Sequence, residues 1–285
     1  MELGSPSQTK EILQKYNLNL KKSLGQNFLV DGNILRNIVG VADITKDDTV
    51  VEIGPGIGSL TQQLAKEAGE VIAVELDDRL IPVLEDTLAE YDNVKIKHGD
   101  ALEVDFDQLA GKNYKVVANL PYYITTPIVM RLLEEDFSVD KIVVMVQKEV
   151  AERMVASPED GKDYGVLSIG VQYHTAANIA FNVPSSVFIP QPRVDSAVVS
   201  LTVREESRAE VLDEKFFFKV VRASFQQRRK TIRNALSKAA NIDLSRDLVD
   251  EALERVGIDS RRRGEKLNIE QFAQLSDLLF KLKYN

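Results

Sequence analysis

Cysteine is absent from this sequence of 285 residues, and histidine occurs only twice. The lack of cysteine excludes disulfides, thiolate metal sites and a cysteine nucleophile. The two histidines, His98 and His174, give little support for a zinc site or a His-based hydrolase triad. The run VLSIGVQYHT also lacks the first glycine of a G-x-S-x-G elbow, so Ser168 with His174 is not a hydrolase signature. We therefore expect no metal and no hydrolase chemistry.

Long apolar runs are also missing. No stretch of 18 or more apolar residues occurs, and the first 30 residues lack the charged and then apolar order of a signal peptide. The sequence therefore predicts a cytoplasmic protein without a membrane partner. Nothing in the sequence indicates a dimer interface, and we expect a monomer.

Acidic residues are scarce in one part of an otherwise acidic chain. The net charge is -8, yet residues 204–285 contain 18 Lys and Arg against 14 Asp and Glu. Residues 215–242 contain eight basic side chains and no acidic one, and RRRGEK follows at residues 261–266. This pattern favours the binding of a polyanion despite the low overall isoelectric point. The alternative is that the basic residues only solvate helix faces.

Strand-like and helix-like segments alternate along most of the chain. Apolar runs rich in β-branched residues lie at residues 49–53, 71–76, 94–98, 115–118, 141–146 and 197–203. Segments with helical periodicity, such as 60–67, 80–90 and 128–135, separate them. This alternation predicts an α/β fold with a doubly wound, mostly parallel sheet.

Only helices are expected after the last of these strands. Helical patterns lie at residues 215–224, 231–239, 246–256 and 269–281, beyond the polar segment EESRAEVLDE. We place a domain boundary in this segment, which gives a first domain of residues 1–206 and a small helical domain of residues 207–285.

The first chemical motif is VVEIGPGIGSL at residues 50–60. A glycine-rich turn between a strand and a helix lets the main chain approach a ligand closely, and a helix N-terminus favours polar or anionic groups. A dehydrogenase fingerprint would need glycine at position 59, but Ser59 stands there, and no P-loop motif occurs. The form E-x-G-x-G-x-G, with Glu52, Gly54, Gly56 and Gly58, resembles the first motif of S-adenosylmethionine methyltransferases. In that reading Glu52 lies near the ammonium group of the cofactor.

Two further acidic residues follow the next two strands. Glu75 stands 21 residues after Gly54, where a carboxylate can accept hydrogen bonds from both hydroxyls of a ribose. Asp100 follows the third strand, where a carboxylate can accept from an adenine amino group. Each acid alone is equally well explained as a helix N-cap or a surface residue. Together with the glycine turn they favour one nucleoside site.

The stretch VVANLPYYITTP at residues 116–127 places Asn119 at the carboxyl end of the fourth strand. We expect Thr126 to be the N-cap of the next helix, with Pro127 in its first turn. The alternative is that this stretch only forms a tight turn between the strand and the helix.

An exocyclic amine on a nucleobase is a poor nucleophile, because its lone pair is delocalised into the ring.

Two acceptors at this turn can hold the two N–H groups of such an amine. They are the side-chain oxygen of Asn119 and the main-chain carbonyl of Leu120, and they favour a pyramidal, more nucleophilic nitrogen in the transition state. Pro121 stiffens the loop, and Tyr122 offers a flat face for an extruded base. Methylation of an amino group needs no cysteine, in contrast to methylation at pyrimidine C5.

The motifs taken together resemble the ribosomal RNA adenine N6-dimethyltransferase family that modifies the small ribosomal subunit. They are KKSLGQNFLVD at residues 21–31, EIGPGIG, Glu75 and the GDA segment, NLPYY, VFIPQPRVDSAV and SFQQRRKTIRNAL. The resemblance covers the chain from about residue 10 to its end. It implies a seven-stranded methyltransferase sheet with a small all-helical C-terminal domain. It also implies S-adenosylmethionine as methyl donor and two adjacent adenines near the 3′ end of the small-subunit RNA as targets, modified during subunit assembly.

The resemblance also assigns site residues. It implies cofactor binding by Gln26, Asn27, Leu29, Gly54, Gly56, Glu75, Asp100 and Asn119. The target base is held by Asn119, Leu120, Pro121 and Tyr122, with Phe188 stacked on its other face. From the residues alone, Phe188 is better explained as a hydrophobic plug in a proline-stiffened loop. From the acid-free run, we expect RNA phosphates to contact Arg228, Arg229, Lys230 and Arg233.

Two other functions remain open at this point. Resistance methyltransferases that modify large-subunit RNA share the NFL, glycine-turn and N-[LI]-P-Y pattern, although SLGQNFLVD and QQRRKTIRNAL favour the small-subunit group. Alternatively, the protein acts mainly as an assembly factor, whose binding to the immature subunit matters more than its chemistry. We expect no DNA partner.

Overall fold

The computed structural model describes residues 3–18, 25–135 and 137–284, and the chain divides into two compact units. The first unit comprises Met1–Ala151 and Ala177–Val203, and the second comprises Glu152–Ala176 and Arg204–Asn285. The domain boundary between residues 206 and 207 stays a prediction, while the contacts also group Glu152–Ala176 with the C-terminal residues. Residues 21–24 of the stretch KKSLGQNFLVD lie outside the described residues.

A seven-stranded sheet has the strand order β4-β3-β2-β5-β6-β9-β7. The strands from β4 to β6 pair in parallel, and β9 runs antiparallel to β6. The predicted doubly wound, mostly parallel sheet is therefore confirmed. The strands are β2 (Thr49–Ile53), β3 (Glu70–Glu75), β4 (Val94–His98), β5 (Tyr114–Asn119), β6 (Val139–Gln147), β7 (Thr175–Val183) and β9 (Ser196–Val203).

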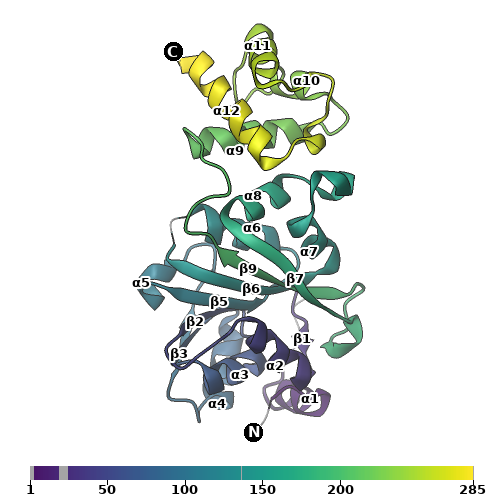
Figure 1. Cartoon of the computed structure of the whole chain (residues 1–285). Coiled ribbons are helices and arrows are strands. Elements are labelled where there is room, and N and C mark those ends of the chain that lie inside the picture. Colours follow the sequence, from purple (N-terminus) through teal and green to yellow (C-terminus); the bar gives the residue numbers. More distant parts are fainter. Residues whose placement is uncertain (1–2, 19–24, 136, 285) are drawn as a thin grey trace. The chain divides into compact units, whose positions relative to one another are not determined.

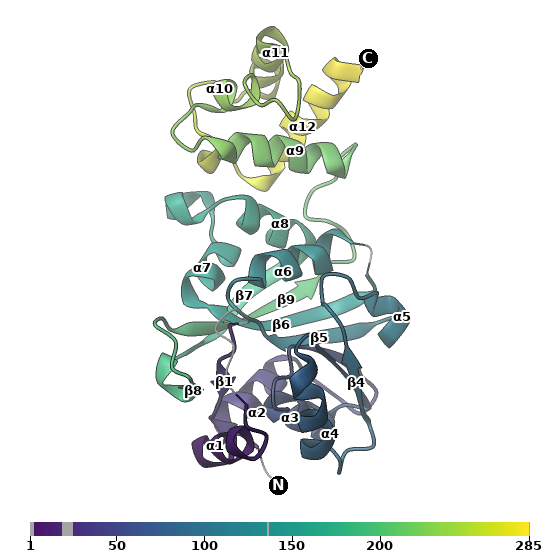
Figure 2. The same ribbon diagram turned by 180° about the vertical axis from the view of Figure 1, so that it is seen from behind.

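Helices of the first unit cover both faces of this sheet. Figures 1 and 2 show α2 and α3 on one face and α6 on the other. On the first face, α2 and α3 bury apolar side chains such as Leu35 and Leu64 in the same cluster as Val50 and Val117 from the strands. Burial of such a side chain stabilises the fold by roughly 1.5 to 3 kcal/mol. The helices are α1 (Pro6–Lys15), α2 (Gly32–Val41), α3 (Ser59–Glu67), α4 (Ile81–Thr87), α5 (Phe106–Ala110), α6 (Thr125–Glu134) and α7 (Lys148–Val155), which extends into the second unit.

The expected N-cap of α6 is wrong by two residues. The helix begins at Thr125, so Thr126 lies inside it, and its N-cap position is Ile124, which has no side chain able to cap. The Thr125 Oγ1 instead donates a hydrogen bond to the carbonyl oxygen of Pro121 at 3.2 Å. Pro127 lies in the first turn, as expected.

A second, two-stranded sheet joins two segments that are far apart in sequence. Strand β1 (Phe28–Leu29) pairs antiparallel with β8 (Phe188–Ile189), so that Leu29 stands opposite Phe188. The main-chain N–H of Val30 extends the pairing by donating to the carbonyl of Val187 at 2.8 Å. This pairing brings the segment before α2 to the segment before β9.

The second unit is helical and is packed around aromatic rings. Its elements are α8 (Val166–His174), α9 (Glu214–Gln226), α10 (Ile232–Leu236), α11 (Arg246–Val256) and α12 (Ile269–Tyr284). Tyr173 stacks on Phe217 with a centroid distance of 5.0 Å, and Tyr164 meets Phe225 edge-on at 6.1 Å. These contacts are the physical reason why Glu152–Ala176 belongs to this unit.

None of the helices in the described residues is long and apolar enough to span a membrane.

Candidate active site

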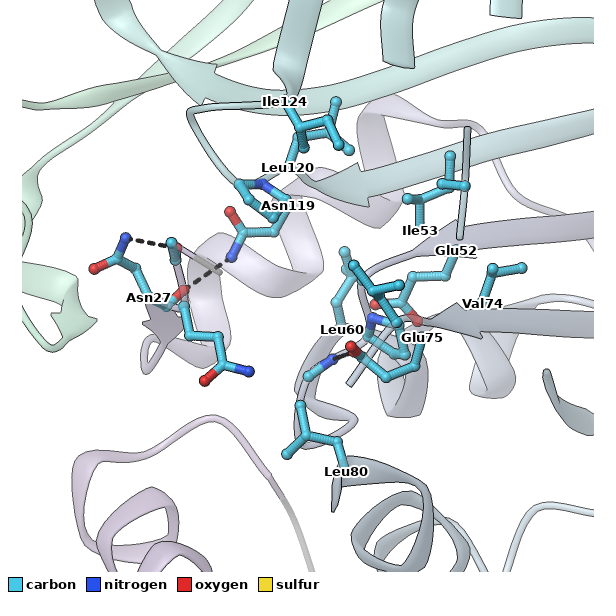
Figure 3. Close-up of a pocket in the computed structure, with 18 of the residues that line it drawn as sticks. Asn27, Glu52, Ile53, Leu60, Val74, Glu75, Leu80, Asn119, Leu120 and Ile124 are labelled. Atoms are coloured by element: carbon cyan, nitrogen blue, oxygen red, sulfur yellow. Dashed lines mark hydrogen bonds between the residues drawn. The ribbon is translucent and has the colours of Figure 1, made fainter. Parts of the chain in front are cut away.

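One pocket lies in the first unit at the carboxyl ends of β2, β3, β4 and β5 (Figure 3). Parallel strands carry their ligand sites at this edge of the sheet. Among its lining residues are eleven of the twelve that the family resemblance assigned to the cofactor or the target base: Gln26, Asn27, Leu29, Gly54, Gly56, Glu75, Asp100, Asn119, Leu120, Pro121 and Tyr122. Figure 3 shows Asn27, Asn119 and Glu75 around the same space. The twelfth, Phe188, is not among the lining residues.

The glycine turn after β2 depends on left-handed main-chain conformations. The φ angles of Gly54, Gly56 and Gly58 are 70°, 62° and 89°. A Cβ atom on Gly56 would lie 2.8 Å from the Cε1 atom of Phe28, whereas one on Gly54 would meet no atom within 4 Å. Glycine is thus required at both positions by conformation and, at position 56, also by packing.

Glu75 is the last residue of β3, and its carboxyl group lines the pocket. Its Oε2 accepts a hydrogen bond from the N–H of Gly56 at 3.1 Å, and its Oε1 accepts from the N–H of Asp77 at 2.8 Å. Burial raises the pKa of the carboxyl, and these two hydrogen bonds oppose the rise. Each oxygen has a second lone pair, so both can still accept a hydrogen bond from a ligand hydroxyl.

Asp77 was not identified from the sequence, although it positions one of the predicted residues. It is 2% exposed and accepts a hydrogen bond from the Gln26 side chain at 2.9 Å. The neighbouring Arg79 guanidinium holds the pKa of Asp77 far below its usual range. Asp77 therefore remains charged and anchors Gln26 at the pocket wall. Its place two residues after Glu75 is the only sequence signal for this role.

Asp100 also lines the pocket, after the end of β4. The N–H of Leu102 donates to its Oδ1 at 2.9 Å. The N–H of Gly99 donates to the main-chain carbonyl of Glu75 at 2.9 Å, which ties the ends of β3 and β4 together. The two acids predicted to hold a nucleoside are therefore brought to one wall.

Asn119 is held in one orientation by a distant segment. Its Nδ2 donates to the main-chain carbonyl of Asn27 at 3.2 Å (Figure 3). A carbonyl can only accept, so the contact fixes which end of the amide is the nitrogen. The side-chain oxygen of Asn119 is therefore available as an acceptor in the pocket.

Further hydrogen bonds hold the rest of the loop after β5. The hydroxyl of Tyr122 and the Oγ of Ser196 lie 2.7 Å apart, and the carbonyl of Pro121 accepts from the N–H of Ile124 at 3.2 Å as well as from Thr125. Ser196 is fully buried at the start of β9. Sequence reasoning missed Ser196, because no motif connects it with Tyr122. A rigid loop of this kind keeps the acceptor groups in place without a ligand.

Phe188 lies in the core on the same face of the sheet as α2 and α3. It is 3% exposed, and it belongs to the apolar cluster that contains Leu29. The structure therefore places this ring as a packing partner of Leu29, and stacking of Phe188 on a base stays a prediction.

The four basic residues predicted to bind RNA phosphates belong to the second unit and differ in their contacts. The Arg228 guanidinium donates to the carbonyls of Lys162 and Tyr164, and the Arg233 guanidinium pairs with Asp250. Arg229 and Lys230 are exposed, and their side chains contact no hydrogen-bond or ion-pair partner in the described part of the chain. The last two are thus the side chains most available to an external anion.

Comparison with known proteins identifies the family. The sequence model of the family described as ribosomal RNA adenine dimethylase matches residues 17–281. The chain belongs to the ribosomal RNA adenine dimethylase family. Membership confirms the enzyme class and the cofactor predicted from the sequence: an adenine dimethyltransferase for ribosomal RNA that uses S-adenosylmethionine.

Similar members of the ribosomal RNA adenine dimethylase family span almost the same length. The chain is 52% identical to ribosomal RNA small subunit methyltransferase A of Listeria monocytogenes over 98% of this chain and 97% of the relative. It is 53% identical to the protein of the same name from Bacillus pumilus, with 98% of each chain covered.

Two solved structures have the same architecture as this dimethylase. A dimethyladenosine transferase from Plasmodium falciparum aligns with a TM-score of 0.76 at 28% identity, covering 87% of this chain and 95% of the other. The 23S rRNA methyltransferase ErmE aligns with a TM-score of 0.69 at 26% identity, covering 89% and 99%.

The pocket of the dimethylase fits S-adenosylmethionine. Glu52 is 1% exposed, and its Oε2 lies in the wall of the pocket without a hydrogen-bond partner in the described residues. Such a buried acid can balance the charge of an ammonium group. Glu75 retains lone pairs for two hydroxyls, and open space faces Gly54. Burial raises the pKa of Glu52 to about 8, and the nearby charge of Glu75 adds to the rise.

Cofactor affinity is expected to increase with pH up to about 8. Below that pKa, Glu52 is neutral and must release a proton before it can attract a cation, so affinity rises by up to about tenfold per pH unit. Calorimetric titration with S-adenosylmethionine in buffers of different ionisation enthalpy measures both the affinity and the released proton. Glu52→Gln is the control, because it retains the titration of the cofactor's own amino group, near pH 8. An identical pH slope in both proteins would refute the role of Glu52.

Proposed function

We propose that this protein transfers two methyl groups to each of two adjacent adenines near the 3′ end of the small-subunit ribosomal RNA, during assembly of the subunit. The observation that carries the proposal is the joint presence of a nucleoside pocket and an oriented amide at the same sheet edge, in a chain more than half identical to small-subunit methyltransferases. The solved large-subunit methyltransferase is only 26% identical.

The chemistry needs little more than placement of the adenine amine. When bound, S-adenosylmethionine supplies an electrophilic methyl group. The oxygen of Asn119 and the carbonyl of Leu120 accept the two N–H groups of the adenine, which localises the nitrogen lone pair as the new N–C bond forms. The electron pair of the sulfur–methyl bond would remain on the sulfur, and the methylated nitrogen loses a proton to water and becomes a neutral amine. For the second transfer, one N–H remains to be held.

Methyl transfer to purified ribosomal subunits tests the proposal. Small subunits that lack the modification are incubated with labelled S-adenosylmethionine, large subunits are treated in parallel, and the modified bases are mapped. Dimethylated adjacent adenines only in small-subunit RNA are the expected result. Label in large-subunit RNA would assign the protein to the resistance group instead. Tight binding of small subunits without any label would favour the assembly factor.

Partners and location follow from this substrate. We propose that the protein acts on small subunits in the cytoplasm, as a monomer and without a DNA partner. Sedimentation of the protein alone and with subunits tests the monomer. A stable dimer in solution would refute it.

We propose that Arg229 and Lys230 contact RNA phosphates. Each reversal, Arg229→Glu or Lys230→Glu, is expected to weaken subunit binding and to reduce the salt slope of the logarithm of the binding constant by about 0.7 to 0.9. Lys112→Glu is the matched control, because this lysine is also exposed but lies before β5, at the sheet edge opposite to the pocket. Unchanged slopes in both variants would remove these residues from the interface.

We propose that Arg228 and Arg233 also contact the RNA. Both side chains are already engaged within the second unit, Arg228 with two carbonyls and Arg233 with Asp250. Their substitution is therefore also expected to lower stability, so binding by these variants is interpreted only alongside their thermal unfolding.

A further inference from the structure

An exposed aromatic ring stands at the mouth of the pocket. Among the described residues, the exposed large apolar side chains are Leu76, Tyr123, Val194, Leu212 and Tyr284. Only Leu76 and Tyr123 line the pocket, and Tyr123, 55% exposed, is the aromatic one of the two. A single exposed apolar side chain is common on protein surfaces, so the place of this aromatic ring in the lining of the ligand pocket is the observation that indicates a binding role.

The Tyr123 ring is held in place although it is exposed. A Cβ atom on Gly25 would lie 3.3 Å from the Cδ1 of Tyr123 and 3.4 Å from the Cβ of Pro121. The φ of Gly25 is 59°, so this close approach uses a conformation that favours glycine. The hydrogen bond from Ile124 to the carbonyl of Pro121 closes the turn that carries the ring. The turn and the contact with Gly25 thus keep the ring beside the pocket, although more than half of the residue is exposed.

The two consecutive tyrosines of the loop have different environments. Tyr122 is half-buried and its hydroxyl contacts Ser196, whereas the hydroxyl of Tyr123 makes no hydrogen bond within the described residues. The fold therefore does not need the Tyr123 hydroxyl. What this residue presents to the solvent is a flat apolar face.

An enzyme that extrudes a base leaves the neighbouring base without its stacking partner. Aromatic side chains replace such a partner in proteins that bind single-stranded nucleic acid, and they do so for any base, because every base has a π-face. The loop that holds the extruded adenine carries Tyr123 three residues after Leu120. The neighbouring base is attached to the extruded adenine by one phosphodiester link, so it lies at the mouth of the pocket.

We propose that Tyr123 stacks on the nucleobase next to the adenine that occupies the pocket. The inference rests on the proposed function. Because the two target adenines are adjacent, the base on Tyr123 is the second target while one member of the pair occupies the pocket, and it is a base outside the pair while the other member does. In the first case the ring holds the second target beside the site while the first one reacts.

Steady-state kinetics on undermethylated small subunits test this role. Tyr123→Ala is expected to raise KM for subunits roughly 5- to 150-fold, the range that corresponds to loss of one stacked base, with kcat close to the wild-type value. Tyr123→Phe keeps the flat face and is expected to behave as wild type. Tyr123→Leu is apolar but not flat, and is expected to resemble Tyr123→Ala.

Two controls separate stacking from other roles. Affinity of Tyr123→Ala for S-adenosylmethionine is expected to be unchanged, which shows an intact cofactor site. Tyr284→Ala removes a similarly exposed tyrosine from α12 and is expected to leave KM unchanged. Wild-type KM in Tyr123→Ala, or full activity in Tyr123→Leu, would overturn the proposal. Failure of the proposed function is distinguishable, since the wild-type protein would then label no small-subunit RNA.

Discussion

Asn119→Ala is expected to lower kcat for methyl transfer by about 10²- to 10³-fold, while small subunits and S-adenosylmethionine still bind. The expected size is that of removing one preorganised polar group from a site where charge develops in the transition state. The substitution removes the side-chain oxygen that we propose to accept the adenine N–H. It also removes the hydrogen bond to the carbonyl of Asn27, so some loss of order in the loop is expected. Single-turnover transfer to subunits, with subunit binding measured separately, distinguishes these effects.

Asn119→Asp provides a more conservative comparison. It retains an acceptor oxygen but cannot donate to the Asn27 carbonyl, so the side chain loses the contact that orients it. We expect its activity to lie between that of the wild type and that of Asn119→Ala. If Asn119→Ala loses subunit binding together with activity, or unfolds at a much lower temperature, Asn119 supports the fold instead of the reaction.

The second large effect is expected at the cofactor. Glu75→Ala should weaken binding of S-adenosylmethionine by about 100-fold or more, because hydrogen bonds to a charged acceptor contribute about 1.5 to 3 kcal/mol each and Glu75 is predicted to hold two ribose hydroxyls. The substitution also removes the acceptor of the Gly56 N–H, on which the glycine turn rests. Calorimetric titration of the purified protein measures the loss directly and needs no RNA.

Glu70 provides the matched control for Glu75. It lies at the opposite end of β3 and pairs with Lys95 at the surface. An exposed pair of this kind contributes little to stability, so Glu70→Gln is expected to bind cofactor as the wild type does. Glu75→Gln, which keeps one acceptor oxygen, should show a smaller defect than Glu75→Ala. Equal cofactor affinity in Glu75→Gln and the wild type would show that a neutral side chain is sufficient.

Several elements were readable from the sequence because their signals are local. The strands β2 and β4 have the predicted bounds, and so does helix α11. In these three elements the run of β-branched residues, or the helical periodicity, begins and ends at the same residues as the strand or helix. Helix α8 and strand β7 were not identified. VLSIGVQYH is as apolar on all sides as a buried strand, and TAANIAFNV contains alanine and asparagine, which are weak strand formers.

The sequence by itself determined the chemical groups and the edge of the sheet at which they meet. Gly54 follows β2, while Glu75 and Asn119 are the last residues of β3 and β5, and the carboxyl ends of parallel strands share one edge of the sheet. The family motifs therefore predict a pocket at this edge, while the role of Phe188 stays a prediction.

Only the tertiary structure decided how these groups are held. The amide of Asn119 is oriented by Asn27, and the hydroxyl of Tyr122 is held by Ser196, at separations of 92 and 74 residues along the chain. Hydrogen bonds of this kind arise from the folding of distant segments onto each other, and no local pattern encodes them. For the same reason the sequence does not distinguish the four basic residues from one another. In the folded chain Arg228 and Arg233 contact other residues of the second unit, whereas Arg229 and Lys230 are exposed without such contacts in the described residues.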